Sequence, residues 1–265
     1  MNKSVERQKY ILNKLFEYAF VSTIDIAREL GVSDETIRRD INTLAERNML
    51  KKVRTGAEAI RTSFRRDTDY SSRLRHNQKQ KSSIGARAAM MIEDNMVVGL
   101  DCGVSVQSVV SALSKVKNVI FVTNSIPIAT ILMHKIESGE ISGKIVMIGG
   151  EIETKNRFSK GAIAIDMLDR FRFDISFVSC TALTTESIFS YSLDECAYSA
   201  RLIANSQRSI LVAESDKLSK HSLYRFASIS DIDALIVDDV VSVSPELSSV
   251  LAKKKVELIA VSDAD

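Results

Sequence analysis

The segment from residue 31 to residue 41 reads Gly31-Val32-Ser33-Asp34-Glu35-Thr36-Ile37-Arg38-Arg39-Asp40-Ile41. Gly31 is the residue type that ends a helix in a left-handed cap, and Ser33 is a preferred N-cap. Upstream, Thr23 is a further N-cap candidate, followed by apolar residues at helical spacing. The segment therefore predicts two short helices joined by a tight glycine turn, with the second helix starting after Ser33.

The helix expected after Ser33 has one apolar face and one polar face. Its apolar residues recur at i, i+4 and i+7: Ile37, Ile41 and Leu44. Arg38 and Arg39 lie off that face, and their planar guanidinium groups suit phosphate oxygens or guanine O6 and N7. Asn42, one turn further on, suits adenine. We expect a helix-turn-helix whose second helix enters the major groove of DNA; the alternative is a solvated surface helix.

The residues on either side complete a small domain. A first helix is expected from near Ser4, because apolar residues recur at helical spacing: Ile11, Leu12, Leu15, Phe16 and Ala19. Asn48 suits the C-terminal cap of the helix that follows Ser33. Residues 49–60 carry Lys52 and Arg54 before a Thr-Gly turn, which predicts a short basic hairpin.

The charge of the chain is uneven along its length. Residues 1–81 hold 18 Lys and Arg against 11 Asp and Glu, a net charge of +7, whereas residues 82–265 hold 18 against 23, a net charge of −5. A basic front end indicates a module that faces a polyanion. Residues 61–81 contain seven basic residues and few apolar ones. We therefore expect a DNA-binding domain over 1–60, a basic linker over 61–81 and a second domain over 82–265.

In the second domain, short apolar runs alternate with helical stretches. The apolar runs cover residues 96–100, 119–122, 145–148, 175–178, 210–213, 234–237 and 256–260. The helical stretches cover residues 83–92, 105–113, 126–136, 163–168, 193–205 and 245–253. Apolar strands that alternate with helices predict a largely parallel sheet with helices on both faces.

The composition is that of an ordinary globular protein. The 265 residues are 45% hydrophobic and 26% charged, which excludes a disordered, collagen-like or coiled-coil chain. Apolar runs stay well short of the roughly 20 residues of a membrane span, and the first residues are polar, so we expect a cytoplasmic protein. The cysteines and histidines are widely spaced: Cys102, Cys180, Cys196, His76, His134 and His221. This spacing predicts no disulfide framework, no metal site and no cofactor.

Polar loops follow several of the expected strands. Asp101-Cys102-Gly103-Val104-Ser105 opens a helix, so its backbone N–H groups and the Ser105 hydroxyl can hold a phosphate. Thr123-Asn124-Ser125 either contacts a sugar or caps the next helix. Gly149-Gly150 either allows close approach of a ligand or forms a tight turn, and Lys217 either neutralises a phosphate or lies on the surface. A parallel sheet brings such loops to one edge.

Residues 31–41 resemble the signature of the DeoR family of bacterial transcriptional repressors, in which V-S-x-x-T-I-R-R-D-L is characteristic. The resemblance extends over nearly the whole chain. It implies an α/β protein, in which a small N-terminal winged helix-turn-helix domain precedes a Rossmann-like, mostly parallel α/β domain of the ribose-5-phosphate isomerase and deaminase type. In the family, that second domain senses a phosphorylated sugar or a related metabolite.

The residue types and the resemblance together give two sets of candidate site residues. The DNA-binding set is Ser33, Thr36, Arg38, Arg39, Asn42, Lys52 and Arg54. The effector-binding set is Asp101, Gly103, Ser105, Thr123, Asn124, Gly149, Gly150, Glu195 and Lys217. The chain departs from the family pattern at Val104, Ser179, Thr181, Ser199 and Glu214, and in the wing at Lys52 and Thr55.

These features predict a sequence-specific DNA-binding regulator and not an enzyme: a repressor of a carbohydrate-metabolism operon whose operator affinity responds to a phosphorylated sugar. The expected partners are double-stranded operator DNA, the effector and further copies of the chain in a homodimer or homotetramer, without a membrane. One alternative is a sugar-phosphate isomerase or deaminase with an accessory DNA-binding domain, in which Asp101, Glu195 and Lys217 would act in catalysis. A second alternative is an architectural DNA-binding protein without a ligand.

Overall fold

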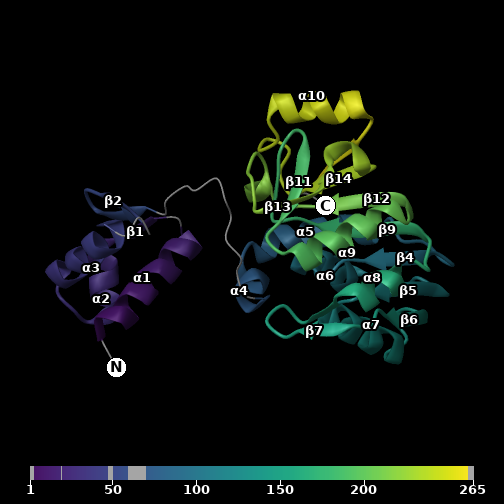
Figure 1. The fold of residues 1–265 in the computed structure, drawn as a ribbon, viewed down its shortest axis with the longest axis horizontal. Coiled ribbons are helices and arrows are strands. Elements are labelled where there is room, and N and C mark those ends of the chain that lie inside the picture. The colour runs from purple at the N-terminus through teal and green to yellow at the C-terminus, as the bar shows by residue number, and fades with distance from the viewer. Residues whose placement is uncertain (1–2, 19, 47–49, 59–69, 262–265) are drawn as a thin grey trace. The chain divides into compact units, whose positions relative to one another are not determined.

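The structure is a computed structural model that describes residues 3–18, 20–46, 50–58 and 70–261 (Figure 1). The chain divides into two compact units, residues 1–62 and residues 63–265, which are described separately. None of the helices in the described ranges is long and apolar enough to cross a membrane. The cap expected at Asn48 and the first part of the expected linker, residues 61–69, lie outside the described residues.

The first unit is a winged helix-turn-helix. Its elements are α1 (Lys3–Tyr18), β1 (Phe20–Ser22), α2 (Thr23–Leu30), α3 (Asp34–Glu46), β2 (Lys51–Val53) and β3 (Gly56–Glu58). The three strands pair antiparallel in the order β1-β3-β2, so the expected hairpin is extended by a strand that lies before α2. The winged helix-turn-helix expected from the sequence is confirmed in this unit.

Local capping explains where α2 and α3 begin and end. The N-cap of α2 is Ser22, whose Oγ accepts the Asp25 N–H at 3.4 Å, so the expectation of Thr23 is off by one residue. Gly31 ends α2 with a φ of 62°, a left-handed conformation that favours glycine. Ser33 Oγ then accepts the Thr36 N–H at 3.3 Å and caps α3 as predicted.

The hydrophobic core of the first unit holds α3 in place through the apolar face of that helix. Its buried residues come from all three helices and from the wing: Ile11, Leu15, Val21, Ile26, Ala27, Ile37, Ile41, Leu44, Leu50 and Ala57. Gly56 is part of this packing, because a Cβ atom there would collide with the Val21 carbonyl on β1. The apolar stripe of α3 therefore faces inward, and its other face is left for contacts outside the unit.

A buried carboxylate ties the recognition helix α3 to α1. Asp40 is 4% exposed, and its Oδ2 accepts Arg7 Nε at 2.7 Å. Its Oδ1 accepts Ser4 Oγ at 2.8 Å and Gln8 Nε2 at 3.1 Å. Three donors from one helix thus converge on one side chain of the other, which satisfies the buried charge and sets the angle at which α3 is presented.

We predict that Asp40→Ala destabilises the first unit by about 1 to 3 kcal/mol, because three donors from α1 lose their common acceptor. Hydrogen exchange of the α1 and α3 amides in the full chain measures this change. The matched control is Glu46→Ala, which removes an exposed carboxylate from the last turn of the same helix and should change stability by less than about 0.5 kcal/mol. Equal exchange in the two variants would contradict the role given to Asp40.

The second unit is built on a seven-stranded parallel sheet in the order β15-β14-β12-β9-β4-β5-β6. The strands are β4 (Val97–Leu100), β5 (Val119–Thr123), β6 (Gly143–Met147), β9 (Phe173–Ser179), β12 (Ser206–Val212), β14 (Ala234–Val237) and β15 (Glu257–Ala260). Every pairing within this sheet is parallel. Each of the seven apolar runs identified in the sequence overlaps one of these strands and extends at most one residue beyond it at either end, which confirms the parallel α/β class.

Helices cover both faces of the sheet (Figure 1). One face packs against α5 (Gln78–Ala89), α6 (Val104–Ala112) and α7 (Ile126–Glu137). The other face packs against α8 (Ala162–Leu168), α9 (Leu193–Ala204) and α10 (Pro245–Lys254). Side chains alternate between the two faces along each strand, so successive apolar residues of one strand enter different cores.

Short antiparallel elements sit beyond the carboxyl ends of the parallel strands and were not predicted. They are β7 (Glu151–Glu153) with β8 (Phe158–Lys160), and β10 (Ala182–Leu183), β11 (Ser187–Ser190) and β13 (Tyr224–Ser228). Two 3₁₀ turns, η1 (Ser215–Lys217) and η2 (Ile229–Asp231), complete the unit. These strands are too short for a periodic pattern to stand out in the sequence.

The second part of the expected linker is helical in the structure. Residues 70–75 form α4 (Tyr70–Arg75), and α5 begins at Gln78, five residues before the predicted start at residue 83. Tyr70 and Lys81 are buried in the second unit. The structure differs from the expected solvated linker at residues 70–81, because Tyr70, Arg73, His76 and Lys81 have partners within the second unit.

Candidate functional site

The outer face of α3 carries the predicted DNA-reading residues. Arg38 and Arg39 are both exposed, and Arg39 Nε lies 3.3 Å from Glu35 Oε1 one turn earlier. Asn42 is partly exposed on the next turn. At the start of the helix, Ser33 Oγ and Thr36 Oγ1 lie 2.8 Å apart. The helix thus presents guanidinium and amide groups to solvent while its apolar face is buried.

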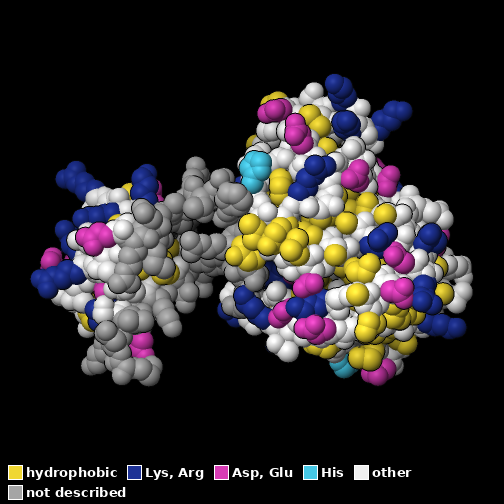
Figure 2. Space-filling view, in the orientation of Figure 1, with side chains coloured by type: hydrophobic (Ala, Val, Ile, Leu, Met, Phe, Trp, Pro, Cys, Tyr) yellow, Lys and Arg dark blue, Asp and Glu magenta, His cyan; other side chains and the backbone are white. Residues whose placement is uncertain are grey.

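The wing adds basic groups to the same unit. Lys52 and Arg54 are exposed, and Lys51 Nζ lies 3.4 Å from Glu58 Oε2 across the hairpin. Figure 2 shows Lys and Arg side chains over α3 and over β2 in the first unit. The first unit therefore offers a helix for the major groove and a basic hairpin for the phosphate backbone, the two parts that groove recognition needs.

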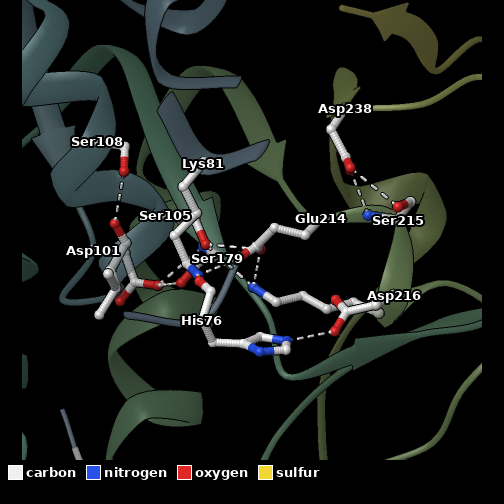
Figure 3. A network of polar contacts seen from close by, with 12 residues as sticks. His76, Lys81, Asp101, Ser105, Ser108, Ser179, Glu214, Ser215, Asp216 and Asp238 are labelled. Atoms are coloured by element: carbon white, nitrogen blue, oxygen red, sulfur yellow. Dashed lines mark hydrogen bonds and ion pairs between the residues drawn. The ribbon is translucent and has the colours of Figure 1, made fainter. Parts of the chain in front are cut away.

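In the second unit, polar side chains meet at the carboxyl edge of the parallel sheet (Figure 3). The loop after β4 supplies Ser105 at the start of α6, and the loop after β12 supplies Glu214 and Lys217. Ser105 Oγ donates to Glu214 Oε2 at 3.0 Å and accepts from Lys217 Nζ at 3.2 Å. The sheet thus brings Ser105 and Lys217 together, as the sequence predicted for these two residues.

Two ammonium groups flank one buried carboxylate in this cluster. Lys81 Nζ lies 2.8 Å from Glu214 Oε1, and Lys217 Nζ lies 2.5 Å from Glu214 Oε2. Burial opposes ionisation of Glu214, but the two ammonium groups outweigh it and hold its pKa well below the ordinary value. Burial lowers the pKa of Lys81, and the Glu214 carboxylate partly offsets that effect. Lys81, Lys217 and Glu214 together carry two positive charges against one negative charge, and the Asp216 carboxylate nearby also acts on Lys81.

Asp101 forms a second anchor of the same edge. Its Oδ1 accepts the Cys102 N–H at 2.8 Å, and its Oδ2 accepts the Ser179 N–H at 3.1 Å and Ser179 Oγ at 3.3 Å. Burial raises the pKa of Asp101, and the hydrogen bonds from Ser179 and Cys102 act in the opposite direction. Gly103 caps α6, and a Cβ atom there would collide with the Ser179 hydroxyl, so the glycine keeps the two loops in contact.

The loop after β5 is tied mainly to its own neighbourhood. Thr123 Oγ1 accepts the Ser125 N–H at 3.0 Å, and Ser125 Oγ accepts the Ile128 N–H at 3.4 Å as the N-cap of α7. Asn124 is fully buried, and its Nδ2 donates to the Ser159 carbonyl at 2.9 Å. Among the described residues, its Oδ1 is one of three buried side-chain atoms without a hydrogen-bond partner.

The remaining predicted effector residues lie around the cluster and not in it. Glu195, in the first turn of α9, accepts Ser190 Oγ at 2.7 Å and pairs with Arg73 at 3.6 Å. Gly149 is exposed, and Gly150 has a φ of 142° where a Cβ atom would collide with the Lys160 carbonyl of β8. This packing accounts for Gly150 as a turn residue next to the hairpin β7–β8.

Three members of the polar cluster were not in the predicted effector set. Lys81 lies on α5, Ser179 ends β9, and Glu214 follows β12. A signal for Lys81 exists in the sequence, because it shares a helical face with Ile84 and Ala88, where a lysine stands out among buried apolar positions. Ser179 and Glu214 are positions where the chain departs from the family pattern, and Glu214 opens the polar run of residues 214–217, but neither feature distinguishes them from the polar residues beside them.

The cysteines have the character of core residues. All three are free and buried. Burial raises the pKa of Cys102 well above its ordinary value and that of Cys196 to about 11, so neither thiol is readily ionised. Within the described ranges, no group of three or more His, Cys, Asp or Glu side chains is arranged to hold a metal ion.

The charge state of Glu214 gives a direct test of the cluster. Because its pKa is depressed, the carboxylate should stay ionised as the pH falls from about 7 to about 4, whereas an unperturbed glutamate titrates near pH 4.3. The stability that the ionised group contributes should persist over that range and be lost only at lower pH. The ¹³C shift of the Glu214 carboxyl, assigned with Glu214→Gln, measures this; a midpoint near pH 4.3 would contradict the paired geometry.

A winged helix-turn-helix unit with exposed arginines, followed by a parallel α/β unit with a polar site at its carboxyl edge, defines a two-domain transcriptional regulator. The chain belongs to the DeoR family. Residues 7–63 match the model of the DeoR-like helix-turn-helix domain, and residues 76–239 match that of the DeoR C terminal sensor domain. The resemblance stated from residues 31–41 is thereby confirmed over both units.

Named relatives are regulators. The HTH-type transcriptional repressor GlcR of Bacillus subtilis (strain 168) is 31% identical over 233 residues, 88% of this chain and 88% of that protein. The glycerol-3-phosphate regulon repressor of Escherichia coli (strain K12) is 27% identical over 237 residues, 89% of this chain and 91% of that protein. These relatives support the interpretation as a DNA-binding repressor and not the isomerase alternative.

Among solved structures, ribose 5-phosphate isomerase from Plasmodium falciparum aligns with 54% of this chain and 54% of that chain. The sequence identity is 14% and the TM-score is 0.36. A similarity of this size carries no function over to the chain.

Proposed function

We propose that this protein represses genes of carbohydrate metabolism and that a phosphorylated sugar, or a related phosphate-bearing metabolite, changes its affinity for operator DNA. The observation that carries the effector part is the cluster of Lys81, Lys217 and Ser105 around the buried Glu214. Its excess of one positive charge lies at the N-terminus of α6, where backbone N–H groups and the helix dipole favour an anion.

On the DNA side, α3 enters the major groove and the wing contacts the backbone. Arg38, Arg39 and Asn42 read base edges in this proposal, whereas Lys52 and Arg54 contact phosphates. Ser33 and Thr36 act at the start of α3, where N–H groups face the phosphate backbone. We assign DNA binding to residues 1–60 and effector sensing to residues 82–265, extended at its start by α4 and the first turn of α5.

On the effector side, the phosphate contacts the ammonium groups of Lys81 and Lys217, the Ser105 hydroxyl and the first N–H groups of α6. Gly103 leaves the backbone of that turn accessible. Asp101 and Asn124 lie on the neighbouring loops and accept hydrogen bonds from sugar hydroxyls in this proposal. A fully buried amide oxygen without a partner, such as Asn124 Oδ1, is suited to such a donor.

The charge state of Glu214 argues against this residue as the general base of an isomerase. Aldose–ketose isomerisation needs a general base whose pKa lies near neutrality. Two ammonium groups hold the pKa of Glu214 far below that range. Glu195 accepts a hydrogen bond from Ser190 and pairs with Arg73. The relatives reported above carry the names of regulators, which agrees with this argument.

Thermal shift with phosphorylated and unphosphorylated sugars tests the effector site. A phosphorylated ligand should stabilise the full chain by about 2.7 kcal/mol at a hundredfold excess over its Kd, and the unphosphorylated sugar should not. Lys217→Met should abolish the shift, whereas Lys144→Met, which removes an exposed lysine from β6, should retain it. A shift that survives Lys217→Met would place the ligand elsewhere, and no shift with any phosphorylated sugar would contradict the effector proposal.

Because the DNA-binding domain is small, we expect that specific recognition of an operator requires more than one copy of the chain. A single winged helix-turn-helix buries a small interface, so we expect a homodimer or homotetramer, acting in the cytoplasm on half-sites about 10 bp or a multiple of it apart. Sedimentation of the full chain at micromolar concentration measures the assembly. A monomer that binds a single half-site with full specificity would contradict this expectation.

A further inference from the structure

The helix α4 is the first described element of the second unit, and it is held at three places by polar contacts. Tyr70 OH donates to Gln107 Oε1 at 2.6 Å. Arg73 Nη2 donates to Asn156 Oδ1 at 2.9 Å, and its Nη1 lies 3.6 Å from Glu195 Oε1. Just after the helix, His76 Nε2 lies 2.9 Å from Asp216 Oδ2. Helix α4 and His76 are therefore in contact with four side chains from distant parts of the sequence: Gln107, Asn156, Glu195 and Asp216.

Two of these four anchors, Gln107 and Asp216, adjoin a residue of the proposed effector site. Gln107 lies on α6, two residues after Ser105. Asp216 lies on η1, next to Lys217, and Figure 3 shows His76 and Asp216 beside the cluster of Lys81 and Glu214. Two of the anchors of α4 therefore lie next to Ser105 and Lys217, which are proposed to contact the ligand.

Lys81 connects α4 to the cluster directly. Its Nζ donates to the His76 carbonyl, at the end of the α4 segment, and pairs with Glu214. An ammonium group has three donors. The His76 carbonyl and Glu214 use two of them, and a phosphate that takes the third attracts the ammonium group more strongly than the neutral carbonyl does, which draws Lys81 Nζ away from His76. Occupation of the site thus acts on the backbone of residue 76.

We propose that α4 is a latch that couples the effector site to the DNA-binding unit. The contacts of Tyr70, Arg73 and His76 hold α4 on the sensor, and an anion at Lys81 and Lys217 loosens them. The chain runs from α4 back to the DNA-binding unit, so a held α4 restricts the positions open to that unit. Release widens that range and weakens operator binding, because a larger conformational entropy must then be lost on DNA. This inference rests on the proposed function.

Hydrogen exchange on the full chain separates the latch from the effector site. Inorganic phosphate is the first probe and glycerol 3-phosphate the second, each compared with chloride at matched ionic strength. We expect slower exchange at residues 103–107 and exchange about tenfold faster or more at residues 71–77. Protection at 103–107 without faster exchange at 71–77 would overturn the latch and leave the effector site standing. No protection at 103–107 with either probe would contradict the proposed function and the latch together.

A matched pair of variants tests the latch without any ligand. Arg73→Gln removes the ion pair that holds α4, and Arg170→Gln removes the exposed pair with Asp166, which lies on α8. The DNA is a fragment that the wild-type chain selects from a random pool. Arg73→Gln should bind it about fivefold more weakly or worse, and Arg170→Gln as wild type does. Tyr70→Phe, which removes one hydroxyl, provides a milder second variant. Wild-type affinity in both latch variants would overturn the proposal.

Discussion

The double variant Arg38→Ala, Arg39→Ala should lose specific operator binding while its fold stays intact. Both side chains are exposed on α3, and the core of the first unit uses the opposite face of that helix. A bidentate contact to a base contributes about 1 to 3 kcal/mol, so each single variant should weaken binding by about tenfold to a hundredfold. The double variant should approach the affinity for random DNA. Binding isotherms on the selected DNA fragment measure the loss.

The control for this prediction is Arg28→Ala. Arg28 is a basic residue on α2 of the same unit, and its side chain is 78% exposed and pairs with Asp25 at 3.7 Å. Removing it changes the net charge of the unit as each single variant does. If Arg28→Ala weakened binding as much as Arg38→Ala, the effect would be one of overall charge, and α3 would lose its assignment to the groove. A weaker salt dependence without lost specificity would assign the arginines to phosphates.

Glu214→Gln should destabilise the second unit by about 3 to 5 kcal/mol, because it removes the carboxylate that two buried ammonium groups share. The substitution keeps the shape of the side chain, which is 1% exposed, so the loss is one of charge. Inorganic phosphate should restore much of the loss, since the anion supplies the missing negative charge. Thermal unfolding with and without phosphate measures both effects.

The same variant has a predicted pH dependence. Burial already lowers the pKa of Lys81, and loss of Glu214 lowers it further. A lysine whose pKa is lower in the folded chain makes folding more favourable as the pH rises, because the unfolded chain then binds more protons. The stability of Glu214→Gln should therefore rise toward alkaline pH.

The control for Glu214→Gln is Glu140→Gln, which loses a partly exposed pair with Lys135 at 2.7 Å. It should cost at most about 1 kcal/mol and show no rescue by phosphate. Rescue of both variants would indicate a general salt effect. A neutral Glu214→Gln would show that the two lysines do not need the carboxylate, and the charge balance on which the effector site is argued would fail.

The DNA-reading helix was predictable because its signals are local. The glycine turn, the Ser33 cap and the apolar stripe lie within a few turns of one another, and each acts on the backbone nearby. The predicted N-cap of α2, Thr23, differs from the observed N-cap, Ser22, by one residue. The role of Asp40 was not predictable, because its partners lie on α1 and only packing brings the two helices together.

The parallel sheet was predictable for a different reason. A strand that is buried on both faces must be apolar throughout, so each central strand leaves a continuous run in the sequence. The antiparallel strands β10, β11 and β13 leave no such run. They form because distant segments pair, as Ile188 does with Ala227, and no residue within one segment specifies that partner.

The sequence by itself therefore determined the class of both units, the recognition helix and the edge of the sheet where polar loops gather. Only the tertiary structure decided which charges meet there. Lys81 lies in a basic stretch that has the composition of a linker, yet α5 packs against α6 with Gly85 at the contact, where a Cβ atom would collide with the backbone of Ser108. That packing places the Lys81 ammonium beside Glu214, because pairing between distant residues depends on how helices and loops pack in three dimensions.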